Sequence, residues 1–241
     1  MMKNSDTRIV SALAAGAARL SIACGLLFAL ILGSLHVLEP EFDPTWRFIS
    51  EYALGGFGWM MNLAFLALAL SLACAGVAIL SQVRPIVGYI GLAVLGIAAI
   101  GMLIAGIFTT DPETASRGAD AATFSGSMHL LGASLDYTPV AALVLSFVLA
   151  RNTSWRPIRK LLFITASITL VGLAAFMVVL PYDGRIGPGV LAGLFGRFLL
   201  LSYLGWLLAV DFYAIKLRNA QEVEHRIAAG SGSVVPTGRA A

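Results

Sequence analysis

Charged residues are scarce in this chain. Asp, Glu, Lys and Arg make up only 12% of its 241 residues, while 59% are hydrophobic. Since an ordinary soluble domain has about 25% charged residues, this composition excludes a soluble globular protein and indicates an integral membrane protein. The 16 Lys and Arg residues lie in short segments between apolar runs and form no basic stripe. Nucleic acid is therefore excluded as a partner, and membrane lipids are expected to surround the chain.

Cysteine and histidine are also few, and their spacing fits no common metal or redox motif. Cys24 and Cys74 both lie in apolar segments and lack CxxC spacing, so we expect them to pack as small apolar side chains. The three histidines form no HxxxH or HExxH motif. A metal site would need several dispersed residues to converge without a motif that brings them together. We therefore predict no metal and no cofactor.

Six apolar runs are each long enough to cross a bilayer as a helix. They cover residues 19–38, 57–80, 86–108, 126–150, 159–180 and 189–215. The first run is too long for a signal peptide, and no A-x-A cleavage site follows it, so it is expected to remain as a helix. The predicted fold class is all-α, a polytopic membrane protein built as a bundle of six transmembrane helices.

The distribution of positive side chains orients this bundle. Twelve of the 16 Lys and Arg residues lie on the side of the two termini, three lie on the opposite side, and Arg197 lies within the last run. Cytoplasmic connections carry the excess of Lys and Arg, so both termini of this multi-pass cell-membrane protein are predicted to be cytoplasmic. Residues 1–18 then form a cytoplasmic segment, 19–215 the transmembrane domain, and 216–241 a polar, Gly/Ser-punctuated cytoplasmic tail that is expected to be disordered.

The three outer connections share a plan, which suggests three hairpins. Each contains an aspartate followed by proline or glycine: Asp43-Pro44, Asp111-Pro112 and Asp183-Gly184. Aspartate before proline is a good helix start, so residues 43–54 are predicted to form a short interfacial helix. Each inward-running helix then carries one polar residue near the outer surface, and these residues are Asn62, His129 and Arg197.

Placing an ionisable side chain inside a bilayer costs free energy, so such residues are the first candidates for a functional site. His129 and Asp136 are seven residues apart, which places them on one face of a helix, and Pro139 is expected to kink that helix. Arg197 is expected to reach Asp136. The resulting buried ion pair would serve either as a lock between two helices or as a ligand site.

Glu51 has two interpretations. It lies four residues after Arg47, which suits a solvent-exposed i,i+4 ion pair on the interfacial helix. Alternatively, Ser50 and Glu51 fold over the outer end of the bundle and join His129 and Arg197 there, with His36 and Asp43 added to the same cluster.

Several short motifs give the chain a family resemblance. They are Phe42-Asp43-Pro44 with Ile49-Ser50-Glu51, Thr110-Asp111-Pro112 with Gly126-Ser127-Met128-His129, and Gly193-Leu194-Phe195-Gly196-Arg197. In this order the chain resembles the prokaryotic membrane family of domain of unknown function 998, over most of residues 20–215. The resemblance implies six membrane helices and no particular activity. A looser similarity to the eukaryotic Frag1 and DRAM membrane families carries no function across.

The leading hypothesis is a non-enzymatic protein that binds a lipid or a small anionic ligand in an outer-side polar pocket. The residues expected to form that pocket are Glu51, Asn62, His129, Asp136 and Arg197, with Arg197 holding a phosphate or carboxylate. The alternatives are an intramembrane lipid hydrolase or transferase with His129 as general base, a transporter, and a structural subunit. The sequence predicts no oligomeric state.

Overall fold

The computed structural model describes residues 9–112, 122–181 and 186–231. The described chain is all-α, and six of its helical segments are long and apolar enough to cross a membrane, as predicted. The third outer connection, with Asp183-Gly184, lies outside the described residues. The α-helices are α1 (Ala12–Leu38), α2 (Gly58–Ile79), α3 (Ile86–Ile107), α4 (Phe124–Ser134), α5 (Thr138–Arg151), α6 (Arg159–Val179) and α7 (Ala192–Ser231), and short 3-10 helices are η1 (Ile49–Leu54), η2 (Leu80–Gln82) and η4 (Thr153–Ile158).

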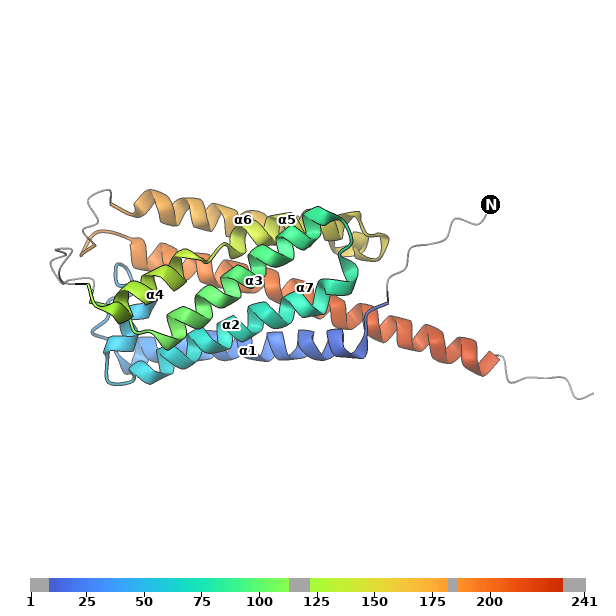
Figure 1. Ribbon diagram of the computed structural model, residues 1–241, viewed down its shortest axis with the longest axis horizontal. Helices are drawn as coiled ribbons and strands as arrows, with labels where there is room; N and C mark the ends of the chain where they lie inside the picture. Colours follow the sequence, from blue (N-terminus) through green and yellow to red (C-terminus); the bar gives the residue numbers. More distant parts are fainter. Residues whose placement is uncertain (1–8, 113–121, 182–185, 232–241) are drawn as a thin grey trace, which may run out of the picture.

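The helices form one elongated bundle (Figure 1). Neighbours in the chain pack on each other throughout: α1 with α2, α2 with α3, α3 with α4 and α5, α5 with α6, and α6 with α7. α7 also contacts α1, α2 and α5 and so joins the two ends of the chain. Apolar side chains such as Leu30, Ile164 and Val178 are exposed on the outside, at 68%, 56% and 83%. An apolar exterior on helices of this length suits lipid as the solvent, and the protein is a polytopic membrane protein.

Hydrogen bonds of one tryptophan and one serine connect three of the helices inside the bundle. The indole nitrogen of Trp206 on α7 donates to Ser146 Oγ on α5 at 2.8 Å. Ser146 Oγ in turn donates to the carbonyl of Leu162 on α6 at 3.2 Å. All three residues are completely buried, so this short chain of hydrogen bonds satisfies the only polar atom of the indole ring in an apolar core.

The fourth predicted span is broken rather than kinked. α4 ends at Ser134, and α5 begins at Thr138 with Pro139 in its first turn. Asp136 Oδ1 accepts hydrogen bonds from the Thr138 hydroxyl at 2.6 Å and from the Thr138 amide at 3.3 Å. Because proline lacks an N–H and aspartate caps free amides, the pair begins a new helix instead of bending the old one.

The last helix is longer than its predicted span. α7 continues through Ser231, although the apolar run ends at residue 215 and a tail was predicted from residue 216. It extends past the bundle on the side where the chain begins (Figure 1). Val10, which precedes α1, connects that segment to the extension of α7. Its amide donates to Gln221 Oε1 and its carbonyl accepts from Arg218. Residues 216–231 are therefore helical, and residues 232–241 lie outside the described chain.

Two glycines allow α3 and α4 to touch through their backbones. A Cβ on Gly101 would lie 2.5 Å from the carbonyl oxygen of Gly132, and one on Gly132 would lie 2.6 Å from the carbonyl oxygen of Gly101. Neither backbone can yield without moving its helix. Small residues at such a crossing are the usual means of close helix approach in membranes.

We expect Gly132→Ala to destabilise the protein by about 1–3 kcal/mol, because the added methyl group overpacks the crossing. Gly96→Ala on α3 is the control, since a Cβ there meets no atom within 4 Å. The measurement is thermal unfolding of the two purified variants in detergent. Equal unfolding temperatures for both variants would show that α3 and α4 do not approach this closely.

Candidate functional site

A buried arginine organises one end of the bundle. Arg197 lies in the second turn of α7 and is only 7% exposed. Its Nη1 donates to three backbone carbonyls, those of Arg47 at 2.7 Å, Gly193 at 3.0 Å and Pro44 at 3.1 Å. Two of these carbonyls belong to the connection after α1. The charge is therefore held by backbone dipoles from a loop rather than by a carboxylate.

The other side of the same guanidinium contacts α1 and η1. Arg197 Nε donates to Nε2 of His36 at 2.9 Å, and Nη2 donates to the Tyr52 hydroxyl at 3.4 Å. His36 Nδ1 lies 2.6 Å from the carbonyl of Leu32, which can only accept, so Nδ1 carries the proton. The histidine is thus a neutral tautomer whose free lone pair faces the arginine. Three separate segments meet at this one side chain.

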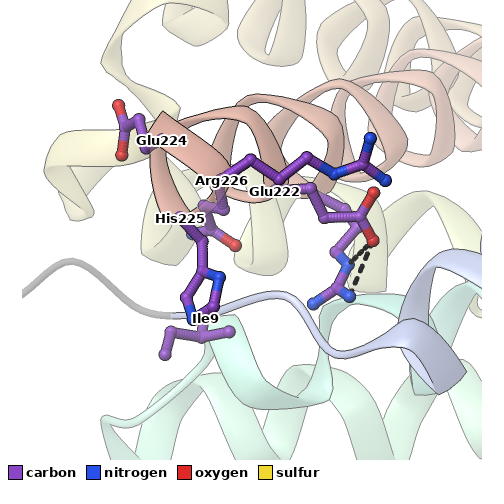
Figure 2. Close-up of a pocket in the computed structure, with 7 residues that line it drawn as sticks. Ile9, Glu222, Glu224, His225 and Arg226 are labelled. Carbon is purple, nitrogen blue, oxygen red and sulfur yellow. Dashed lines mark hydrogen bonds and ion pairs between the residues drawn. The ribbon is translucent and has the colours of Figure 1, made fainter. Parts of the chain in front are cut away.

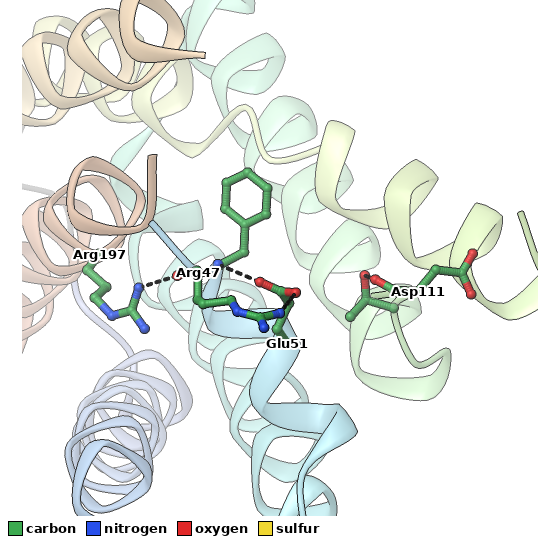
Figure 3. Close-up of polar contacts among 6 residues, drawn as sticks. Arg47, Glu51, Asp111 and Arg197 are labelled. Carbon is green, nitrogen blue, oxygen red and sulfur yellow. Dashed lines mark hydrogen bonds and ion pairs between the residues drawn. The ribbon is translucent and has the colours of Figure 1, made fainter. Parts of the chain in front are cut away.

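Arg47 and Glu51 form the predicted i,i+4 ion pair, but the glutamate is buried. Arg47 Nη1 lies 2.7 Å from Glu51 Oε1, and the Glu51 side chain is 2% exposed. Its second oxygen accepts from the amide of Phe48 at 3.3 Å. The solvent-exposed pair is therefore wrong. Figure 3 shows Glu51 beside Arg47, with Arg197 on the other side of Arg47 and Asp111 set apart.

The connection before η1 is a turn, not the predicted helix over residues 43–54. Asp43 Oδ1 accepts from the Thr45 hydroxyl at 2.7 Å and from the Thr45 amide at 2.9 Å. These hydrogen bonds lower the pKa of Asp43. The Thr45 carbonyl then accepts from the amide of Leu194 at 2.9 Å. The loop docks on the free amides of the α7 N-terminus, which competes with helix formation in the loop itself.

Glu39, which no sequence motif marks, is buried at the start of the same connection between α1 and α2. It directly follows α1 and is 1% exposed. Its Oε1 accepts from the amide of Phe57 at 2.6 Å, and its carboxylate contacts the backbone of Gly55. Its Oε2 is buried without a hydrogen-bond partner among the described residues, as is Nε of Arg47. The only sequence signal was an acid placed directly at the end of an apolar run.

His129 lies elsewhere, between α4, α3 and α2. Its Nδ1 contacts the carbonyls of Phe108 at 2.9 Å and Ala105 at 3.0 Å, and its ring packs edge-on against Phe65. These contacts satisfy the free carbonyls at the end of α3. No hydrogen bond of the described chain joins His129 to Arg197, so His129 packs α4 against α3 instead of joining the Arg197 cluster.

The predicted ion pair between Asp136 and Arg197 is wrong. Asp136 accepts from the amide and hydroxyl of Thr138 at the start of α5, and its neighbour on α7 is the buried hydroxyl of Tyr203. Tyr203 is six residues after Arg197, about 9 Å further along the helix, and the Arg197 guanidinium is directed instead to His36 and the carbonyls of the loop. Asn62 is half-buried on α2, and its Oδ1 has no hydrogen-bond partner in the described chain.

A shallow groove lies at the opposite end of the bundle (Figure 2). It runs between the start of the chain and the extension of α7, and Ile9, Glu222, His225 and Arg226 line it. None of the five candidate residues contributes to it. Another missed residue, Asp211, is completely buried in α7. An acid inside the apolar run 189–215 was the signal for it.

We expect Arg197→Lys to destabilise the protein by about 1–3 kcal/mol, because one ammonium cannot reach His36, Tyr52 and three carbonyls together. Arg226→Lys is the matched control, since Arg226 is exposed on the α7 extension. Thermal unfolding in detergent measures both. If Arg197→Lys unfolds at the wild-type temperature, the arginine does not organise this end of the bundle.

Comparison with known proteins points to one family. The family model described as "Protein of unknown function (DUF998)" matches residues 22–212. This range includes α2–α6, most of α1 and the part of α7 that carries Arg197. No curated protein and no solved structure shows a significant match. Because the match covers more than half of the sequence, the chain belongs to the DUF998 family of membrane proteins of unknown function.

Proposed function

We propose that this protein binds the polar headgroup of a phospholipid, or a small molecule with the same charges, at the end of the bundle that holds Arg197. One observation carries the proposal. Glu39 Oε2 and Arg47 Nε are both buried and both lack a hydrogen-bond partner in the described part of the chain. Buried polar atoms are rarely left unpaired, so an acceptor and a donor of opposite charge favour a ligand that supplies both partners.

The charges of the two side chains suggest the chemistry of that ligand. An ammonium group suits the Glu39 carboxylate, and an oxygen of a phosphate or carboxylate suits the free Nε of Arg47, whose Nη1 already pairs with Glu51. A zwitterion with both groups therefore fits better than the simple anion expected from the sequence. Arg197 keeps an indirect part, because its N–H groups already bind the loop that carries Arg47. Asn62 Oδ1, four residues after the start of α2, adds a further free acceptor.

Aromatic side chains near the cluster favour a lipid as the source of this zwitterion. Trp59 and Phe57 are 64% and 42% exposed, and the Phe57 amide donates to Glu39. Tryptophan collects at the level of lipid headgroups, where its ring is both apolar and polar. A headgroup beside these rings would lie at the height of Glu39.

We further propose that both termini are cytoplasmic and that the Arg197 cluster faces outward. Six spans return the chain to the side on which it begins. Twelve of the 16 Lys and Arg residues lie on the side of the termini, which is the asymmetry that cytoplasmic segments carry.

Transport is the second candidate, and the break between α4 and α5 favours it. Interrupted helices with an acid at the break are typical of secondary transporters, and Asp136 occupies such a position. No comparable observation favours a hydrolase or transferase, because His129 Nδ1 is engaged by two carbonyls. A purely structural subunit would need no binding site. The unpaired atoms of Glu39 and Arg47 therefore favour a ligand-binding role over a structural one.

We expect Glu39→Gln to weaken retention of phosphatidylethanolamine at least about tenfold, or 1.4 kcal/mol, because the amide keeps an acceptor for Phe57 but loses the charge. Native mass spectrometry of the protein from mixed phosphatidylethanolamine and phosphatidylglycerol micelles gives the measurement. Glu224→Gln, exposed on α7, is the control.

Soluble phosphoethanolamine distinguishes a lipid site from a small-molecule site. Competition by the soluble compound at comparable concentration would assign the site to a free zwitterion. Equal retention of both lipids by the wild type and by Glu39→Gln would end the proposal.

For the orientation, we expect a fluorescent protein fused after residue 241 to fluoresce and alkaline phosphatase at the same place to be inactive, because each matures on only one side of a bacterial inner membrane. Fusions within residues 113–121, on the opposite side of the membrane, should give active alkaline phosphatase and a fluorescent protein that does not fluoresce. The reverse pattern of activities would invert the topology.

A further inference from the structure

Asp211 is the most deeply buried acid of the described chain that no element of the fold explains. It is 0% exposed, and neither carboxylate oxygen has a hydrogen-bond partner among the described residues. Its position on α7 is 14 residues after Arg197, about 21 Å along the helix. It therefore lies in the opposite half of the bundle and is independent of the headgroup site. Ionisable side chains at such depth are expensive and usually functional.

Two serines from two other helices lie at the same level. Ser21 Oγ on α1 donates to the carbonyl of Ser71 at 2.9 Å, and Ser71 Oγ on α2 donates to the carbonyl of Ser21 at 2.9 Å. The two hydroxyl oxygens are 3.2 Å apart. This reciprocal pair is completely buried and joins α1 to α2. The packing around it is tight, because a Cβ on Gly25 would lie 2.6 Å from Leu204 of α7 and 3.2 Å from Ser71 Oγ.

The protons of the two serine hydroxyls indicate whether the Asp211 carboxyl group is protonated or ionised. Each serine hydroxyl has one proton, and both protons point to carbonyls. Ser21 lies beside the Asp211 carboxylate but outside hydrogen-bonding geometry. The serines therefore offer Asp211 only lone pairs. An ionised carboxylate would face other acceptors, whereas a protonated one could donate to a serine oxygen.

No positive side chain of the described helices neutralises Asp211. Arg218, two turns further along α7, binds Glu222 and the carbonyl of Val10. Among the other titratable groups, the thiol of Cys74 on α2 interacts with Asp211 and with Cys24 on α1, and the phenol of Tyr213 on α7 donates to the Ser154 carbonyl. The basic residues of α1, α5 and α6 are exposed: Arg19, Arg151, Arg159 and Lys160.

We propose that Asp211 is a proton-binding site, in which its carboxyl group and the hydroxyl oxygens of Ser21 and Ser71 together hold one proton between α1, α2 and α7. The proton is on a carboxyl oxygen of Asp211, and a small movement of this side chain would let it donate to a lone pair of Ser21. Its release to water leaves a carboxylate that needs donors. The serine hydroxyls supply them only by turning away from the carbonyls, which breaks the reciprocal bonds. Occupancy of the site is thereby coupled to the contact between α1 and α2.

Infrared spectra of the purified full chain test the site directly. At neutral pH, the spectrum of wild type minus Asp211→Asn is expected to contain the carbonyl-stretch band of a protonated carboxylic acid, which shifts in D₂O. Ser71→Ala should shift this band, because it removes one hydroxyl oxygen and the donor to the Ser21 carbonyl. Ser34→Ala, whose hydroxyl bonds within α1 to Leu30, should leave the band unchanged.

The pH dependence of unfolding gives a second measurement. A carboxyl group that stays protonated in the folded protein but ionises in the unfolded chain makes the free energy of unfolding fall as the pH rises above the pKa of an exposed aspartate. Asp211→Asn cannot titrate and should abolish this decline, so it should unfold at the wild-type temperature at about pH 4 and at a higher temperature than the wild type at neutral pH.

Two results would overturn the proposal. One is the absence of the acid band from the difference spectrum, which would mean that Asp211 is ionised. The other is loss of the band when sodium replaces choline at constant pH, which would mean that a metal ion occupies the site. If Asp211→Asn does not fold, the serine variants with ¹³C-labelled aspartate decide between the same outcomes.

Discussion

The guanidinium of Arg197 makes the interactions on which its end of the bundle depends. A positive charge in the second turn of a membrane helix requires partners, and here backbone carbonyls, a histidine lone pair and a tyrosine hydroxyl provide them. Because the carbonyls belong to the connection between α1 and α2, the arginine fixes the path of that loop. The path of the loop then determines where Arg47 and Glu51 lie and how Glu39 is enclosed.

Much of the fold was readable from the sequence, because lipid imposes a simple rule. Backbone groups in a bilayer must be satisfied within a helix, so apolar runs of sufficient length translate directly into spans. The break at Asp136 was harder, since proline inside a run predicts either a kink or a new helix. The capping hydrogen bonds from Thr138 decided between them. Similarly, the long α7 crosses from lipid to a polar surface without a change in secondary structure.

The site was less predictable, for a physical reason. Charge complementarity suggested Asp136 as the partner of Arg197, but the partners are mostly backbone carbonyls, which every residue possesses and no sequence pattern marks. Glu51 was correctly paired with Arg47 and incorrectly placed in solvent, because burial depends on how the loop docks on α7. Glu39 and Asp211 were visible as acids in or beside apolar runs, yet their unpaired oxygens appear only in three dimensions.

The length of α7 gives the molecule a mechanical property. Its 40 residues correspond to about 60 Å, roughly twice the hydrocarbon thickness of a bilayer. One rigid rod therefore carries Arg197 near one surface, Asp211 in the opposite half and a polar arm beyond the bundle. A small tilt of this rod within the bundle becomes a larger sideways displacement at the far end of the arm. Any displacement of α7 at Arg197 would therefore be felt at the polar arm beyond the opposite end of the bundle.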